Sequence, residues 1–137
     1  MKRVEESLES GETTFEEAIN KGLIVIEDFD SEAEAEAFIN YASELKDDGE
    51  SATFAIAVSR NWAVATDDRK ATSFFKREFP QLQLLSSLDI LKNYAVKAKL
   101  SPTELKALFQ GVRTRGRYLP SQNHPLLTWW EASINSD

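Results

Sequence analysis

The chain has 137 residues, no cysteine and a single histidine. The lack of cysteine excludes disulfides, thiolate zinc sites and cysteine nucleophiles, and one histidine argues against a histidine-rich metal site. A formal net charge of −7 makes the surface as a whole repel phosphate backbones. Any contact with nucleic acid therefore needs a local basic patch and divalent ions.

Hydropathy indicates neither a membrane span nor a secretory leader. No stretch approaches the roughly 18 apolar residues of a membrane helix, and the opening MKRVEESLESGE lacks the hydrophobic segment of a signal peptide. We therefore expect a cytoplasmic protein with no membrane partner. The length fits one domain with its own core. We expect that domain over residues 1–131, followed by a loose tail over residues 132–137.

The first elements in chain order are a helix, a strand and a longer helix. Residues 15–20 are typical of a helix end, with Gly22 just past it, and LIVIEDF over residues 23–29 predicts a buried strand. Residues 32–45, EAEAEAFINYASEL, contain strong helix formers. Their helical spacing predicts a buried stripe made of Ala35, Phe38, Ile39 and Ala42.

A further helix and strand follow. Asp47 and Glu50 have capping-box spacing and predict a helix that runs to about residue 59. Glu50 precedes Phe54 by one helical turn, so it belongs to the stripe that faces inward. The apolar stretch WAVAT, residues 62–66, predicts a strand directly after this helix.

Asp67 and Asp68 follow that strand and begin another helix, which must stop before Pro80. The stretch QLQLLS, residues 81–86, predicts a third strand. Two helices close the predicted order, over residues 88–99 and 102–115. Strands that alternate with helices indicate an α/β fold with a mostly parallel sheet, in which ligands bind beyond the carboxyl ends of the strands.

The candidate site consists of Glu50, Asp67 and Asp68, which come from separate elements and can converge at the end of one strand. Carboxylate oxygens are the ligands that Mg²⁺ and Mn²⁺ prefer, and a metal-dependent phosphodiesterase needs such a cluster. The alternative is that each carboxylate caps a helix. Arg69 can also offset the paired aspartates in place of a metal.

The stretch GESATFAIAVSRNWAVATDDR, residues 49–69, resembles the PIN-domain nucleases. The likeness is to the bacterial branch of predicted nucleic-acid-binding proteins related to toxin–antitoxin ribonucleases, and it covers roughly residues 4–116. It implies a three-layer α/β/α sandwich with a mostly parallel sheet. It also implies a metal-dependent endoribonuclease in which Glu50, Asp67 and Asp68 are catalytic and hold Mg²⁺ or Mn²⁺ that activates water to cut RNA.

The chain departs from this family at its start. PIN domains begin with a hydrophobic strand that ends in a metal-binding aspartate, whereas residues 1–22 match the family's later linking helices. The resemblance therefore implies an N-terminally truncated sheet, completed by a homo-oligomer or a partner chain, and weaker metal binding. The alternative function is a degenerate, non-catalytic PIN-like module for binding or assembly.

Two clusters near the C-terminus have alternative roles. Arg113, Arg115 and Arg117 form the densest basic spot and are candidates to bind RNA, but cations at a helix C-terminus also offset its dipole. Trp129 and Trp130 follow two leucines. They predict a segment that docks on the core, or an anchor at a protein interface.

Overall fold

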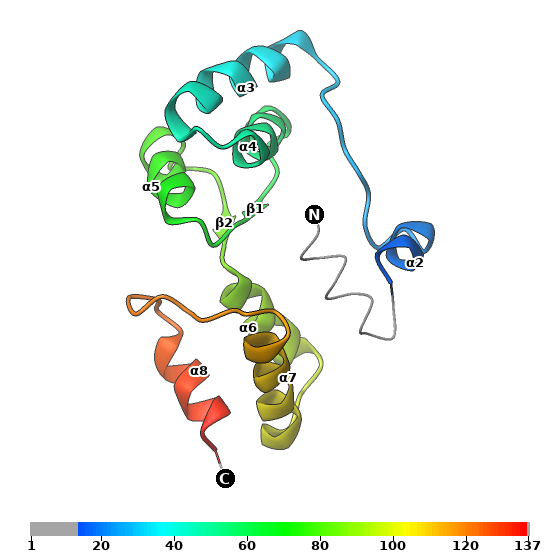
Figure 1. Cartoon of the computed structure of the whole chain (residues 1–137), viewed down its shortest axis with the longest axis vertical. Helices are drawn as coiled ribbons and strands as arrows, with labels where there is room; N and C mark the ends of the chain where they lie inside the picture. The colour runs from blue at the N-terminus through cyan, green and yellow to red at the C-terminus, as the bar shows by residue number, and fades with distance from the viewer. Residues whose placement is uncertain (1–13, 137) are drawn as a thin grey trace. The chain divides into compact units, whose positions relative to one another are not determined.

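The computed structural model describes residues 14–136 and is mainly helical, with 61% of residues in helices and 3% in strands. Figure 1 shows the order of the elements along the chain. The helices and strands are α2 (Phe15–Asn20), α3 (Glu32–Leu45), α4 (Asp48–Arg60), β1 (Val64–Ala65), α5 (Arg69–Glu78), β2 (Leu84–Leu85), α6 (Ser87–Lys97), α7 (Pro102–Thr114) and α8 (Leu127–Ile134).

The predicted three-layer α/β/α sandwich is wrong. In the part of the chain that the structure describes, the sheet consists of β1 and β2 alone, paired in parallel with Val64 opposite Leu84 and Ala65 opposite Leu85. The segment at residues 81–86 thus contributes two paired residues. Two short strands cannot form the middle layer of a sandwich, so the helices pack mainly on one another.

The segment LIVIEDF is extended but is not the predicted buried strand. Leu23, Val25 and Ile26 are 72%, 68% and 67% exposed. Its backbone ends bond to other groups, because Ala18 O accepts from Leu23 N at 2.9 Å and Asp28 O accepts from the Arg60 guanidinium at 2.8 Å. An apolar β-branched run favours burial, but a strand also needs a neighbouring strand edge.

The helices from α3 to α7 confirm the predicted ones, with boundaries that differ by a few residues at most. Three of these helices begin at side-chain caps: Asp47 accepts from Glu50 N, as the capping-box spacing predicted, Ser31 accepts from Glu34 N, and Ser101 forms a full capping box with Glu104. The buried stripe predicted on α3 is partly wrong, since Ile39 is 65% exposed.

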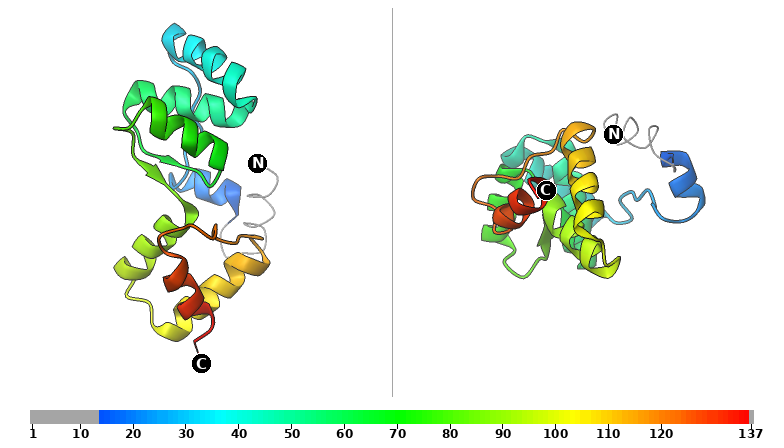
Figure 2. Two further views of the ribbon diagram at one scale, coloured as in Figure 1. Left: turned by 90° about the vertical axis from the view of Figure 1, so that its left-hand side faces the viewer. Right: turned by 90° about the horizontal axis from the view of Figure 1, so that it is seen from below.

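The described chain forms two compact units, one made of residues 27–92 and the other of the segments on either side of it. In the first unit, α3, α4 and α5 surround an aromatic core, and Figure 2 shows these helices from two further sides. Tyr41 meets Phe74, Phe75 and Phe79 edge-on. The core contains Leu45, Phe54, Ala57, Val64, Ala71, Phe74 and Phe75. Burying each phenylalanine contributes about 1.5–3 kcal/mol.

In the second unit, α7 packs against α8. Phe109 is fully buried and stacks on Trp130 with the ring centroids 4.4 Å apart. This stacking confirms that the tryptophan segment docks on a core. Helix α8 was not predicted, because its N-cap Leu126 makes no side-chain capping bond. It continues to the buried Ile134, within the segment expected to be a loose tail.

The expected likeness of residues 1–13 to the linking helices of PIN domains lies outside the described residues. Within residues 14–136, no helix is both long enough and apolar enough to span a bilayer.

Candidate functional site at the start of α4 and α5

Glu50 points from the first turn of α4 toward the end of β1. Asp47 caps α4 by accepting from Glu50 N at 2.8 Å. The carboxylate of Glu50 does not turn back to complete a capping box; its Oε1 accepts from Thr66 Oγ1 at 3.0 Å. Glu50 is half-buried. The inward orientation predicted from its spacing to Phe54 is therefore confirmed.

Thr66 joins Glu50 to Asp68. While its hydroxyl donates to Glu50, the same oxygen accepts from Asp68 N at 3.1 Å. Asp68 is the N-cap of α5, and its Oδ1 accepts from Ala71 N at 2.7 Å. Asp68 therefore caps a helix, as the alternative interpretation expected, and its backbone N–H binds the same hydroxyl that binds Glu50. The Thr66 hydroxyl, just past the carboxyl end of β1, thus contacts both the start of α4 and the start of α5.

The charges around Glu50 oppose its ionisation. Burial raises the pKa of Glu50 above its ordinary value, and the nearby charges of Asp68 and Asp47 raise it further, while the hydrogen bond from Thr66 lowers it. Burial and neighbouring like charges both favour the neutral form of a carboxyl group, so a bound proton or a bound cation would stabilise Glu50. This electrostatic conflict distinguishes Glu50 from an ordinary surface glutamate.

Asp67 faces a different element. Its Oδ1 accepts from Ser87 N at 2.9 Å, and its Oδ2 accepts from Ser87 Oγ. Asp67 thus uses both carboxylate oxygens to fasten the first residue of α6 to the end of β1. The structure brings the Glu50 carboxylate and the Asp68 backbone N–H together at Thr66, and it places the carboxylate of Asp67 on Ser87.

These carboxylates do not form a closed metal cage. Among residues 14–136, no group of three or more histidine, aspartate and glutamate side chains is arranged to hold a metal ion. Two carboxylates still fit a hard divalent cation, because Mg²⁺ commonly takes one or two protein carboxylates and completes its shell with water and substrate phosphates. Glu50 and Asp68 are the pair whose oxygens would hold it.

The arginines proposed for RNA binding lie at the end of α7, in the second unit. Arg113 occupies the last turn of α7, and Arg115 is its C-cap. Arg117 follows with a positive φ of 50°. All three side chains are exposed. Their position at a helix C-terminus is the one in which cations offset the dipole.

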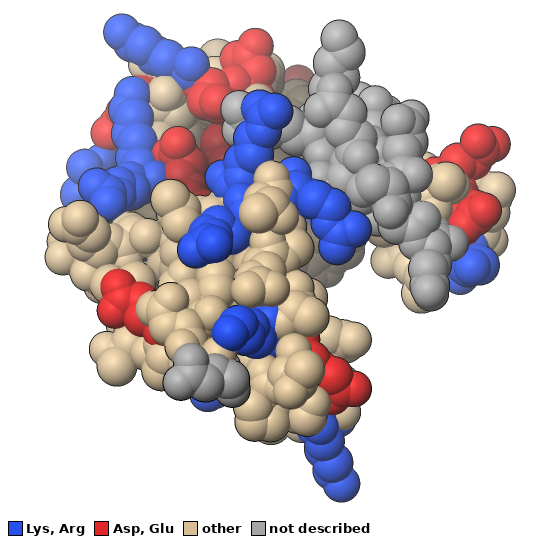
Figure 3. All heavy atoms as spheres, turned by 60° about the horizontal axis from the view of Figure 1, so that its bottom comes forward, with Lys and Arg blue, Asp and Glu red and all other residues tan. Residues whose placement is uncertain are grey.

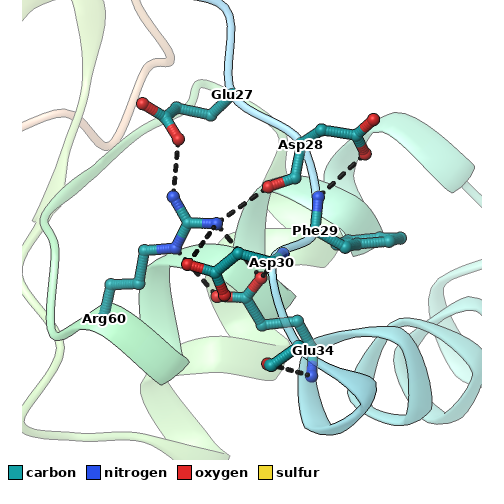
Figure 4. A network of polar contacts seen from close by, with 7 residues as sticks. Glu27, Asp28, Phe29, Asp30, Glu34 and Arg60 are labelled. Atoms are coloured by element: carbon teal, nitrogen blue, oxygen red, sulfur yellow. Dashed lines mark hydrogen bonds and ion pairs between the residues drawn. The ribbon is translucent and has the colours of Figure 1, made fainter.

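One buried ion pair was not predicted. Glu34 on α3 is fully buried, and its Oε1 accepts from Arg60 Nε at 2.8 Å. Arg60 also donates to Glu27 at 2.6 Å and lies 3.5 Å from Asp30, so one cation gathers three acids from α3 and the segment before it (Figure 4). The Arg60 guanidinium lowers the pKa of Glu34 to about 2. No spacing in the sequence pairs these residues, because 26 positions separate Glu34 from Arg60.

The chain matches no family model, no curated protein and no solved structure. The likeness to PIN-domain nucleases stays a prediction from the stretch that contains Glu50, Asp67 and Asp68.

Proposed function

We propose that the chain is a metal-dependent endoribonuclease that hydrolyses RNA phosphodiesters, with Glu50 and Asp68 as its metal-binding carboxylates and Asp67 as the acid beside them. The observation that carries the proposal is that the Thr66 hydroxyl binds both the Glu50 carboxylate and the backbone N–H of Asp68. Glu50 lies in the first turn of α4 and Asp68 is the N-cap of α5, so each carboxylate stands at the start of a different helix.

Each residue has a distinct task in this proposal. Thr66 orients the Glu50 carboxylate by donating to Oε1, which leaves Oε2 for a ligand. Asp68 uses Oδ1 to cap α5 and offers Oδ2. Mg²⁺ or Mn²⁺ at such oxygens lowers the pKa of bound water and offsets the charge that develops on the phosphoryl group. Asp67 keeps the start of α6 attached to the strand end through Ser87.

The sequence likeness to PIN-domain nucleases supports this proposal at the level of the site. The TDDR tetrapeptide and the glutamate that follows Gly49 are its specific features. The fold does not contribute to the support, because the predicted sandwich is wrong for the described chain. Glu50, Asp68 and the preference of hard divalent cations for oxygen ligands are therefore what support the proposed function.

Cleavage of a labelled single-stranded RNA with and without Mg²⁺ or Mn²⁺ tests the proposal. We expect cleavage by the wild-type chain, stopped by a chelator, and a loss of about a hundredfold or more in Asp68→Asn and in Glu50→Gln. Asparagine is also a good N-cap, so Asp68→Asn keeps α5 capped and separates catalysis from folding. Asp48→Asn, in the same turn of α4, is the matched control. No cleavage at any metal concentration would reject the proposal.

A second candidate is a non-catalytic assembly module, and the exposed apolar segment favours it. Leu23, Val25 and Ile26 are all more than two-thirds exposed, and the β1–β2 pair has open edges in the described chain. Extended apolar chains readily add to open sheet edges. In this candidate, a second copy of the chain or a partner chain pairs through the segment and extends the sheet.

Sedimentation equilibrium distinguishes this candidate from the nuclease. An assembly module predicts an oligomer that Val25→Lys dissociates and that Asn40→Lys, on an exposed position of α3, leaves intact. It also predicts no rise in Tm with Mn²⁺, because a ligand that binds only the folded state must raise its stability. A monomer at all accessible concentrations would exclude this candidate.

A further inference from the structure

Helix α5 concentrates positive charge in an acidic chain. Its sequence, RKATSFFKRE, carries four cations and one acid, although the chain as a whole has a net charge of −7. Figure 3 shows several Lys and Arg side chains gathered at the left of the view, the side on which α5 lies in Figure 1. Arg69 directly follows Asp68, so this basic helix begins beside the proposed metal-binding carboxylates.

A pocket of about 390 Å³ opens along α5 and the end of α3. Three of its lining residues are cations and one is an acid, which leaves the lining with two net positive charges. Its residues are Glu44, Leu45, Arg69, Lys70, Ser73, Phe74 and Arg77. Arg69, Ser73 and Arg77 follow one another at intervals of four, so they lie on one face of the helix.

The basic side chains of the pocket differ in how many contacts they make with other residues. Arg77 donates to Glu44 at 2.8 Å and lies over the Phe74 ring at 5.4 Å. Lys70 Nζ donates to Leu45 O at 3.1 Å. The Arg69 side chain has neither a hydrogen bond nor an ion pair with any other residue in the described range. The pocket therefore combines two positioned cations with one guanidinium available for a ligand.

Helix stability does not explain the cations at the start of α5. Arg69 and Lys70 occupy its first two positions, just after the N-cap Asp68. The helix dipole favours anions at this end and cations at the other, so these two charges are placed where the dipole opposes them. Lys76 and Arg77, in the last turn, are at the favoured end. A bound anion would reverse the penalty at the N-terminal end.

We propose that this pocket binds a phosphate of a single-stranded RNA backbone, with Arg69, Lys70 and the Ser73 hydroxyl as its donors. Guanidinium and ammonium groups together with a hydroxyl are the usual partners of phosphate oxygens. The inference rests on the proposed nuclease function, because it assigns the residues that bring the RNA to Glu50 and Asp68. It also supplies the local basic patch that an acidic chain requires.

RNA binding without metal tests the pocket separately from cleavage. Fluorescence anisotropy of a labelled single-stranded RNA is measured in EDTA and at low salt, with the wild-type chain and the double variant Arg69→Gln/Lys70→Gln. We expect the double variant to bind the RNA at least about tenfold more weakly. The slope of log K against log salt concentration should become shallower by about 0.7 for each phosphate that the variant no longer neutralises. Lys76→Gln, on α5 but outside the pocket, should bind as the wild type does.

Each outcome decides the proposal. Arg69→Gln alone repeats the test if loss of the Lys70 bond to Leu45 O prevents folding, since the Arg69 side chain has no structural partner in the described chain. Equal binding by wild type and Arg69→Gln, or no wild-type binding at low salt, overturns the inference. Equally tight, Arg69-dependent binding of heparin or of free phosphate also overturns the assignment to RNA. Arg69-dependent RNA binding without any cleavage supports the pocket and rejects the nuclease.

Discussion

At the scale of single residues, Thr66 is the one that makes Glu50 and Asp68 neighbours. Its hydroxyl donates to one carboxylate and accepts from the backbone of the other residue. The spacing of Glu50 to Phe54 predicted an inward-facing carboxylate, and the TDD sequence predicted acids at the strand end. The direction of Asp67 was not predictable, because its partner Ser87 lies 20 positions away.

Glu50→Gln should stabilise the metal-free protein at neutral pH. The folded state raises the pKa of Glu50, so the ionised carboxylate destabilises the fold, whereas a glutamine carries no charge. The gain should be fully present at neutral pH and should vanish below the ordinary glutamate pKa of 4.5, where the carboxyl is neutral in both states. Thermal melts between acidic and neutral pH in EDTA measure it. A lower Tm for Glu50→Gln at neutral pH would contradict the electrostatic account of the site.

Glu34 should give the opposite pH dependence. Its pKa falls from 4.5 to about 2 on folding, so the stability that it contributes is present above pH 4.5 and is lost as the pH falls toward 2. Glu34→Gln should lower Tm at neutral pH, because it leaves Arg60 without its buried partner. The difference from wild type should shrink in acid. Glu36→Gln, an exposed neighbour on α3, is the control, and an equal effect in both variants would refute the role of the pair.

At the scale of elements, capping residues predicted the helices well, whereas apolar runs predicted the strands poorly. Ser31, Asp47 and Ser101 define helix starts through bonds that are local in sequence, so the helices were predictable. The predicted strand at residues 23–29 is absent. Apolar residues alone do not reveal whether a neighbouring strand is present to pair with. Helix α8 lacked a local capping signal and was missed. Helix starts that depend on neighbouring residues could be predicted from the sequence, whereas the pairing of distant strands could not.

Asp67 fastens β1 to α6, and this role separates it from Asp68. Asp67→Ala should destabilise the protein by about 1 kcal/mol, since Ser87 N and Oγ both lose their acceptor at the start of a helix. Asp67→Asn keeps one acceptor oxygen and should retain much more cleavage activity than Asp68→Asn. Urea unfolding followed by tryptophan fluorescence measures the first effect and RNA cleavage the second. Equal loss of cleavage in both asparagine variants would make Asp67 a metal ligand.

At the scale of the whole molecule, charge is distributed unevenly between the acidic chain and the basic helix α5. Glu50 and Asp68 form an acidic point at the carboxyl end of β1, and α5 adds a positive pocket immediately after it. A cation between two carboxylates and a phosphate beside two basic side chains are complementary requirements of a phosphodiesterase. The sequence revealed the acids of this arrangement; the pocket became visible only from the packing of α5 on the end of α3.

Titration calorimetry with Mn²⁺ tests the central claim most directly. The wild-type chain and Asp48→Asn should each bind one Mn²⁺, because both retain the carboxylates of Glu50 and Asp68, the two residues that Thr66 joins. Glu50→Gln and Asp68→Asn should each bind it at least about tenfold more weakly, since a two-carboxylate site loses half of its charge with either change. Undetectable binding by the wild type, or equal binding by all four proteins, would contradict the account.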